Sequence, residues 1–219
     1  AWWTMDETEG QVVTDSTGGH HGQTHNIIGN PWMTVYRNNP EQLEDTALQL
    51  DGVDDYVEVL DYKGICGTAP RTCAAWIKLN SIGREQVILS WGGNAAGQKW
   101  IFRVSADGKL EVGVWGGYIQ TTRVLGAGSW CHVAAMMDDD GSPNVGKIKL
   151  YINGTPVEMV ANGTQPIDTA AEQDVQMGTM YDGTTQTGFF GGLLDDVRIY
   201  DRVLNNEQLI KLFRPWQDL

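Results

Sequence analysis

Residues 147–160 read KIKLYINGTPVEMV, two apolar strands joined by a tight turn. Ile148 and Leu150 alternate with lysines, and this period of two sends the apolar side chains to one face of a strand. The turn is Asn153-Gly154, a strong hairpin signal, because a type I′ turn needs positive φ at both central residues. The stretch therefore predicts an antiparallel hairpin with one buried face.

The same pattern recurs along the chain. DYVEVL at residues 55–60 also alternates, and Asp107-Gly108 predicts a second type I′ hairpin. Many further short runs are separated by turn residues, as expected for a sandwich or barrel. The only convincing helix lies at 204–213, LNNEQLIKLF, with an asparagine cap at Asn205 or Asn206. We predict an all-β, two-sheet antiparallel sandwich with a short C-terminal helix.

Length and composition agree with this class. The chain has 219 residues, of which 41% are hydrophobic, with 27 glycines and 7 prolines. This is enough apolar material for one two-sheet core, and the glycines suit many turns. We therefore expect a single domain over residues 1–219 and no long linker.

The formal net charge of -13 limits the partners. Nucleic acid and anionic membrane need clustered Lys and Arg, and the sequence has no basic run. No apolar run approaches a membrane span. The chain starts at Ala1 without a targeting segment, so we expect a processed or excised module, part of a larger chain.

Three cysteines leave the redox state open. Cys66 and Cys73 flank a short loop that a disulfide would close, whereas Cys73 and Cys131 each begin an apolar stretch and would suit a cross-strand pair. Three unpaired thiols are the remaining alternative.

Several segments in order resemble one family. They are WTMDETEGQVVTDSTGGHHG (3–22), ALQLDGVDDYVEV (47–59), TCAAWIKLN (72–80), GSWCHVAAMMDDDG followed by KIKLYINGTPV (128–157), and GFFGGLLDDVRIYDRVLNNEQLIKLF (188–213). Together they are similar to the laminin-G-like jelly rolls of the concanavalin A-like superfamily. The resemblance implies a jelly-roll sandwich with one concave and one convex sheet, which binds ligands at the concave face or its rim.

The superfamily also contains hydrolases and lyases, so catalysis needs its own argument. Laminarinase-type members carry E-x-D-x-x-E along one strand; here Glu172 and Asp174 fit, but Met177 replaces the last carboxylate. The lyase and sialidase signatures are absent as well. We predict a non-enzyme.

Acidic residues suggest structural calcium, which takes six to eight oxygen ligands. Asp6, Glu7 and Asp15 cluster in the opening loop. In related jelly rolls a calcium ion joins the N-terminal segment to an aspartate of the last strand; the resemblance carries that role onto Asp195, with Glu7 as partner and a carbonyl from Gly10.

Two weaker metal sites stay open. Asp182 matches a segment that holds calcium in the related pentraxins, although it stands nearly alone here. The histidines His20, His21 and His25 cluster in a polar loop and are a candidate transition-metal set.

Sugar binding would use aromatic faces together with planar polar groups. Trp91 and Trp115 each precede Gly-Gly, while Trp100, Arg103 and Tyr118 fall in neighbouring strands. These five residues form our predicted ligand patch. The alternative is that Trp91 and Trp115 fill the core.

Four other tryptophans lie near the chain ends or in the opening loop. We expect them to cover sheet edges or contact a neighbouring domain; they are Trp2, Trp3, Trp32 and Trp216.

The sequence thus predicts a secreted or cell-surface module that binds a glycan or an extracellular protein and does not insert into a membrane. A spacer or protein-interaction domain without glycan specificity is one alternative. A polysaccharide-degrading enzyme with an unfamiliar site is the other.

Overall fold

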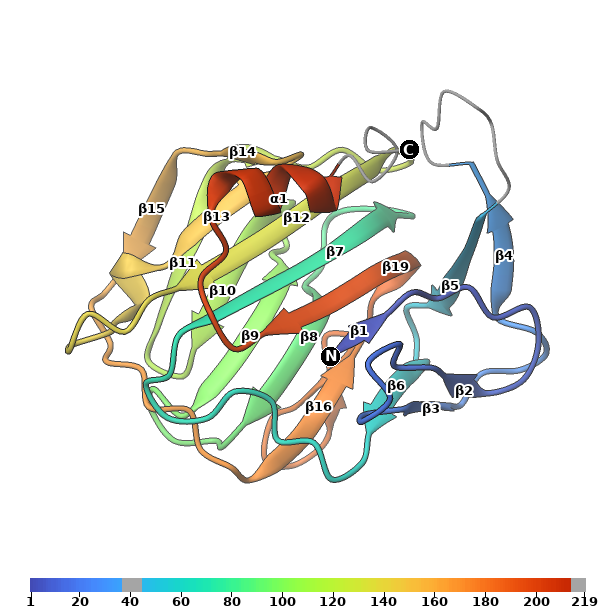
Figure 1. Ribbon diagram of the computed structural model, residues 1–219, viewed down its shortest axis with the longest axis horizontal. Coiled ribbons are helices and arrows are strands. Elements are labelled where there is room, and N and C mark those ends of the chain that lie inside the picture. Colours follow the sequence, from blue (N-terminus) through green and yellow to red (C-terminus); the bar gives the residue numbers. More distant parts are fainter. Residues whose placement is uncertain (37–44, 214–219) are drawn as a thin grey trace.

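The computed structural model describes residues 1–36 and 45–213 (Figure 1). Two large antiparallel sheets pack face to face, and one short helix follows them, so the predicted jelly-roll sandwich is confirmed. Residue 216, one of the predicted edge tryptophans, lies outside the described residues.

Sheet A runs through eight strands. In spatial order they are β14 (Thr155–Pro156), β13 (Lys149–Ile152), β12 (Trp130–Met137), β7 (Arg71–Leu79), β19 (Gly191–Tyr200), β5 (Asp45–Asp51) and β4 (Trp32–Val35), with β1 (Trp2–Trp3) also paired to β19.

Sheet B runs through nine strands. They are β15 (Met159–Asn162), β11 (Gly117–Val124), β10 (Lys109–Val114), β9 (Lys99–Val104), β8 (Gln86–Gly92), β16 (Gln173–Met177), β6 (Tyr56–Val59), β3 (Gly22–His25) and β2 (Val12–Val13). A small hairpin of β17 (Met180–Tyr181) and β18 (Gln186–Thr187) and a 3₁₀ turn, η1 (Val145–Lys147), complete the strands and turns.

The two predicted hairpins both form, but their turns differ. Asn153 and Gly154 both have positive φ, at 52° and 72°, as a type I′ turn requires. Between β9 and β10 only Gly108 is positive, at 75°, and Gly108 N donates to Ser105 O. The type I′ prediction at Asp107 was therefore wrong. A type I′ hairpin has two loop residues, whereas the loop between Val104 and Lys109 consists of residues 105–108.

The core lies between the sheets and follows the predicted alternation. Leu150 and Ile152 of β13 and Val57 and Val59 of β6 all belong to one continuous buried cluster that draws on both sheets. Trp3, one of the tryptophans predicted to cover a sheet edge or contact a neighbouring domain, is instead fully buried in this cluster.

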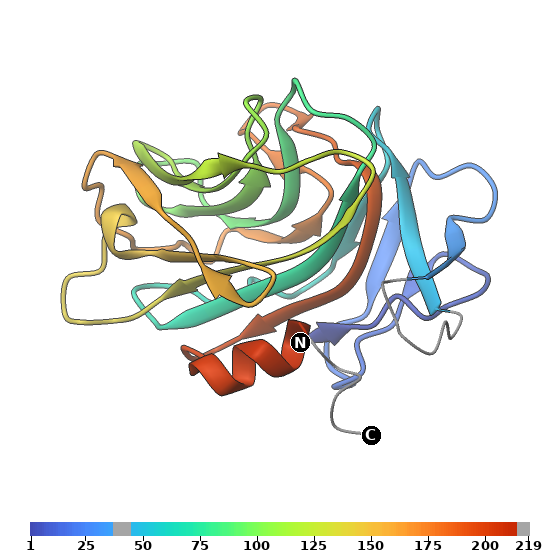
Figure 2. The same cartoon turned by 90° about the horizontal axis from the view of Figure 1, so that it is seen from above.

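Helix α1 (Asn206–Phe213) packs on the outer face of sheet A (Figure 2). Asn205 is the N-cap: its side chain accepts from Gln208 N, and the Gln208 side chain accepts from Asn205 N. Leu204 and Leu209 lie in one apolar cluster with Ala74 and Ala134 of the sheet. The helix forms here because its cap and its apolar stripe both match this surface.

The cysteines are all free thiols. Cys73 pairs in register with Ala135, whereas Cys131 pairs with Ile77, four residues further along β7. At about 3.3 Å per residue this offset is far beyond the reach of a disulfide. The Cys66 thiol instead donates to Lys63 O. Of the three alternatives, three unpaired thiols is the one that the structure shows.

Candidate functional site

The outer face of sheet B carries the polar half of its strands. Along β9 the core takes Trp100, Phe102 and Val104, so the alternate residues Lys99 and Arg103 stand on the outer face. This face includes part of the predicted ligand patch.

Two members of that patch are core residues. Trp91 and Trp100 are both 0% exposed, and their rings stack with centroids 5.9 Å apart. The Trp91 indole donates to Ile65 O at 3.0 Å. A sugar has no access to either ring, so the prediction that they bind ligand was wrong. The burial of Trp100 could have been predicted from the sequence, because the period of two places it on the same strand face as Phe102.

Trp115 and Tyr118 remain at the surface, each half-buried. Trp115 follows β10 and packs against an outer-face apolar cluster that contains Ile101. Tyr118 of β11 pairs in register with Gly113, which pairs in turn with Ile101. Gly113 is buried although it has no side chain, because the side chains of Arg103 and Glu111 lie over it: a Cβ at this position would be 3.8 Å from Arg103 Nη2 and 3.7 Å from Glu111 Oε1.

Arg103, which lies over Gly113, takes part in an ion-pair network. Its guanidinium donates to Glu111 Oε1 at 2.8 and 2.5 Å and to Glu85 Oε2 at 3.1 Å. Burial raises the pKa of Glu111, and the charge of Arg103 opposes that rise. With two carboxylates on one guanidinium, Arg103 does not offer a free positive charge to an anionic ligand.

Lys99 is a buried residue that the sequence did not single out. It is 0% exposed, and its Nζ donates to Asn94 Oδ1 at 2.9 Å, to Tyr181 O at 2.6 Å and to Gln173 Oε1. Burial lowers its pKa to about 8, against the opposing charges of Glu172 and Asp182. Its outer-face position follows from alternation, but its burial depends on segments far away in the sequence.

Lys99 also positions Trp115. The Asn94 oxygen that accepts from Lys99 accepts from Trp115 Nε1 at 3.4 Å. A loop, a strand and the β17–β18 hairpin are thereby joined around one ammonium group. The indole is consequently held in place at the surface, as stacking on a ligand requires.

Asp182, the weaker calcium candidate, caps its own turn. Its Oδ1 accepts from Thr184 N and Thr185 N, and these hydrogen bonds lower its pKa. The nearby ammonium of Lys99 adds positive charge where a cation would have to bind.

Asp15 has a structural part in the opening loop. Its carboxylate accepts from Trp2 N, from Thr17 N and Oγ1, and from Gly19 N and His20 N. Although burial raises its pKa, these hydrogen bonds lower it to about 2. Since both oxygens are already saturated, the prediction of Asp15 as a calcium ligand was wrong.

The other predicted calcium ligands lie in the opening loop and on β19. Burial raises the pKa of Asp6 to about 6, and the neighbouring carboxylates of Asp45 and Asp196 add to the rise. Glu7 Oε1 accepts from Thr14 N at 2.6 Å, while its buried Oε2 has no hydrogen-bond partner.

The last two predicted ligands differ in burial, because Gly10 is exposed whereas Asp195 is fully buried. Gly10 O accepts from the Trp32 indole at 3.1 Å, which leaves its second lone pair. Asp195 is fully buried on β19, opposite Trp76 of β7.

A different acidic group has the tightest geometry. Within the described ranges, the group of three metal-ligating side chains with atoms inside 4.8 Å of one another is Asp51, Asp54 and Asp55. Asp51 Oδ1 accepts from Val53 N, and Asp55 Oδ2 accepts from Asp51 N, so these carboxylates organise their own turn.

The histidines do not form one metal site. His20 stacks on Tyr62 with centroids 3.8 Å apart, and His25 stacks on Tyr56. His21 Nδ1 accepts from Asp15 N. Each imidazole therefore has a separate structural contact.

Comparisons with solved structures find the same fold. Domain 4 of AbnA, a GH43 extracellular arabinanase from Geobacillus stearothermophilus, in complex with arabinotriose, matches with a TM-score of 0.67 and 19% identity, over 97% of this chain and 96% of that one. The CBM40 of Ruminococcus gnavus IT-sialidase, bound to α2,3-sialyllactose, matches with 0.55 and 17%, over 76% and 98%.

An enzyme is also among the similar structures. Trypanosoma rangeli sialidase matches with a TM-score of 0.59 and 13% identity over 97% of this chain, which spans 32% of the sialidase. A search of curated proteins finds no match. Within the described residues, no helix is long and apolar enough to cross a membrane. A family model described as the concanavalin A-like lectin/glucanases superfamily matches residues 51–210, most of the sequence. The chain belongs to the concanavalin A-like lectin/glucanase superfamily.

Proposed function

We propose that the chain is a non-catalytic carbohydrate-binding or adhesion module of an extracellular protein. It binds glycan on the outer face of sheet B, over Gly113. The observation that carries this proposal is the pair of half-buried rings, Trp115 and Tyr118, beside a strand position without a side chain. Sugar C–H faces stack on such rings, and the neighbouring Arg103, whose side chain is 14% exposed, can donate to hydroxyls.

Two kinds of support come from outside this surface. The similar CBM40 is bound to a sialyllactose and the similar arabinanase domain is in complex with arabinotriose, and that arabinanase is extracellular by its description. The net charge of -13 disfavours nucleic acid as a partner. Secretion or display on a cell surface belongs to the same proposal.

The non-catalytic part rests on the carboxylates. Asp174 pairs with Lys63 at 2.9 Å, so it is not the free partner that Glu172 would need for acid–base work. Glu111 and Glu85 share Arg103 rather than facing each other across an open site.

A structural calcium ion between the opening loop and β19 is a further part of the proposal. Its proposed ligands are Asp6, Glu7, Asp195 and the Gly10 carbonyl. The three carboxylates are not among the described groups whose ligand atoms lie within 4.8 Å of one another, so binding the ion has to draw them together. A divalent cation would offset the repulsion that raises the pKa of Asp6 and would satisfy the buried Glu7 Oε2. It would tie the opening loop to β19.

The test compares Trp115→Ala and Tyr118→Ala with Tyr36→Ala, an exposed aromatic on sheet A, on an array that includes arabino-oligosaccharides and sialyllactose. We expect at least tenfold weaker binding for the first two variants, equivalent to about 1.4 kcal/mol, under conditions where a cooperative melting transition shows that both are folded. The control should bind like wild type.

Two results would contradict the proposal. A blank array with wild-type protein would favour a spacer or protein-interaction domain. Release of reducing ends from a polysaccharide panel would favour an enzyme instead.

A further inference from the structure

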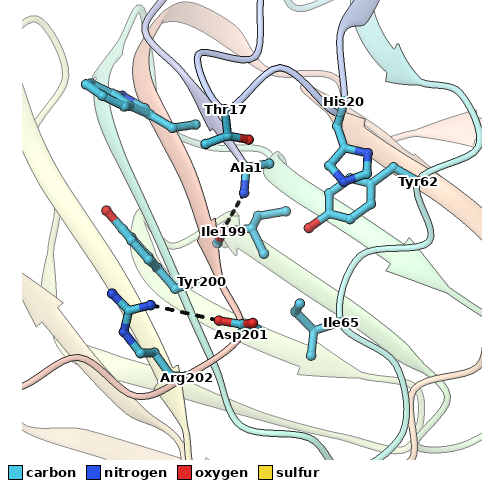
Figure 3. Close-up of a pocket in the computed structure, with 10 residues that line it drawn as sticks. Ala1, Thr17, His20, Tyr62, Ile65, Ile199, Tyr200, Asp201 and Arg202 are labelled. Carbon is cyan, nitrogen blue, oxygen red and sulfur yellow. Dashed lines mark hydrogen bonds and ion pairs between the residues drawn. The ribbon is translucent and has the colours of Figure 1, made fainter.

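A separate cavity lies at the other side of the molecule, where β1 pairs with β19 (Figure 3). Its volume is about 450 Å³. The β2–β3 loop, the segment after β6 and the end of β19 all contribute to it. Its lining residues are Ala1, Trp2, Thr17, His20, Tyr62, Ile65, Ile199, Tyr200, Asp201 and Arg202.

Two aromatic walls flank an apolar floor. Figure 3 shows Tyr62 and Tyr200 on opposite sides of Ile199. Ile199 is 2% exposed and belongs to the main core, so the floor is rigid. Tyr62 is stacked on His20 at 3.8 Å, and the Arg202 guanidinium lies 5.4 Å from the Tyr200 ring centroid. Both rings therefore hold their orientation without a ligand.

The polar groups stand at the rim. The side chains of Asp201 and Arg202 are 81% and 58% exposed, and they form only a loose pair at 4.0 Å. Both remain available for new hydrogen bonds. Burial raises the pKa of Tyr62, so its hydroxyl stays protonated and can donate. Figure 3 shows this hydroxyl directed towards Ile199 between the walls.

These features select one ligand chemistry. The flat rings fit the C–H face of a sugar, while Asp201 accepts from hydroxyls and Arg202 donates to them. A wholly apolar ligand would cover these charges without replacing their water. At the rim the side chains of Asp201 and Arg202 balance each other, and the chain carries a net charge of -13, so these side chains give an anionic sugar no net attraction.

We propose that this cavity is a second saccharide-binding site, for a neutral sugar unit held between Tyr62 and Tyr200. The volume lies in the ordinary range for ligand sites and suits roughly one or two sugar rings. The site uses no residue of the sheet B surface, so it stands or fails independently of the proposed function.

The experiment is a two-dimensional amide NMR titration of the whole chain with the methyl glycosides of glucose, galactose and arabinose at millimolar concentrations. With at least one of them we expect saturating shifts for the amides of Thr17, Tyr62, Tyr200 and Arg202. The same shifts should persist in Trp115→Ala, which removes only the sheet B site. Shifts confined to residues around Gly113, or no shifts with any of the three sugars, would overturn the second site.

Variants sharpen the result. Asp201→Ala and Tyr62→Phe each remove one polar group without opening the core, and each should weaken pocket binding at least fivefold. Asp107→Ala, an exposed acid in the β9–β10 turn, is the matched control and should leave the shifts unchanged. Wild-type affinity in both test variants would refute the site, and tighter pocket binding of sialyllactose than of the methyl glycosides would refute its neutral specificity.

Discussion

In both sheets inward and outward side chains alternate along the strands, but the outward side chains of the two sheets differ in polarity. On sheet A the outward residues Ala74, Ala134 and Met136 are apolar, and α1 covers them with Leu209 and Leu212. On sheet B the outward side chains include Lys99, Arg103 and Glu111, which satisfy one another and nearby loops. A face that is sealed by a helix serves stability, whereas a face finished by polar networks and two half-buried rings stays available to a ligand.

The largest expected effect tests the sealed face. Leu209→Ala should reduce the free energy of unfolding by about 3 kcal/mol, because it leaves a cavity beneath α1. Urea unfolding gives the value. Glycan binding by the folded variant should be unchanged, so a loss of binding at temperatures where it is folded would break the division between the two faces.

The polar face should respond in a different way. Arg103→Met leaves Glu111 buried without its partner and should cost about 2 kcal/mol, given that the guanidinium keeps some contact with solvent. Arg103→Met combined with Glu111→Gln should recover most of that loss in the same urea experiment. If the double variant is no more stable than the single one, the stability lost in Arg103→Met does not come from leaving the Glu111 carboxylate unpaired.

The helix cap gives a smaller effect. Asn205→Ala removes the acceptor for Gln208 N and should lower stability by about 1 kcal/mol. Asn205→Asp, which keeps an acceptor, should retain wild-type stability. Equal destabilisation by both substitutions would mean that the cap does not hold α1 on sheet A.

The smallest effect concerns the three neighbouring carboxylates Asp6, Asp45 and Asp196, and it depends on pH. The pKa of Asp6 rises from 3.8 to about 6 in the folded protein, so the folded state binds more protons across that window and stability falls as the pH rises through it. In EGTA, Asp6→Asn should therefore stabilise the protein above pH 6 by about 1 kcal/mol, after allowing for solvent screening. Below pH 4 the gain should vanish.

Calcium should invert this result. If the proposed ion binds, wild type should melt at a higher temperature in Ca²⁺ than in EGTA, and Asp6→Asn should lose that gain. A melting temperature that ignores Ca²⁺ in both proteins would remove the ion from the proposal while leaving the pH effect intact.

Local features were readable from single segments. The hairpin at Asn153-Gly154, the Asn205 cap and the alternation of β6 and β13 each depend on residues within one turn or strand, and each was confirmed. Turn type at Asp107 failed because loop length is set by the pairing of two strands.

By itself, then, the amino-acid sequence determined the fold class, the strand faces and the helix, since backbone periodicity and turn chemistry act between near neighbours. Tertiary structure alone decided which tryptophans reach the surface, that Lys99 is buried and which donors the Asp15 carboxylate accepts hydrogen bonds from. The two Trp-Gly-Gly motifs are alike in sequence, but Trp91 is buried in the core and donates to Ile65 O, whereas Trp115 stays half-buried against an outer-face cluster. Burial is a property of segments brought together from across the chain, so similar local sequence had opposite outcomes.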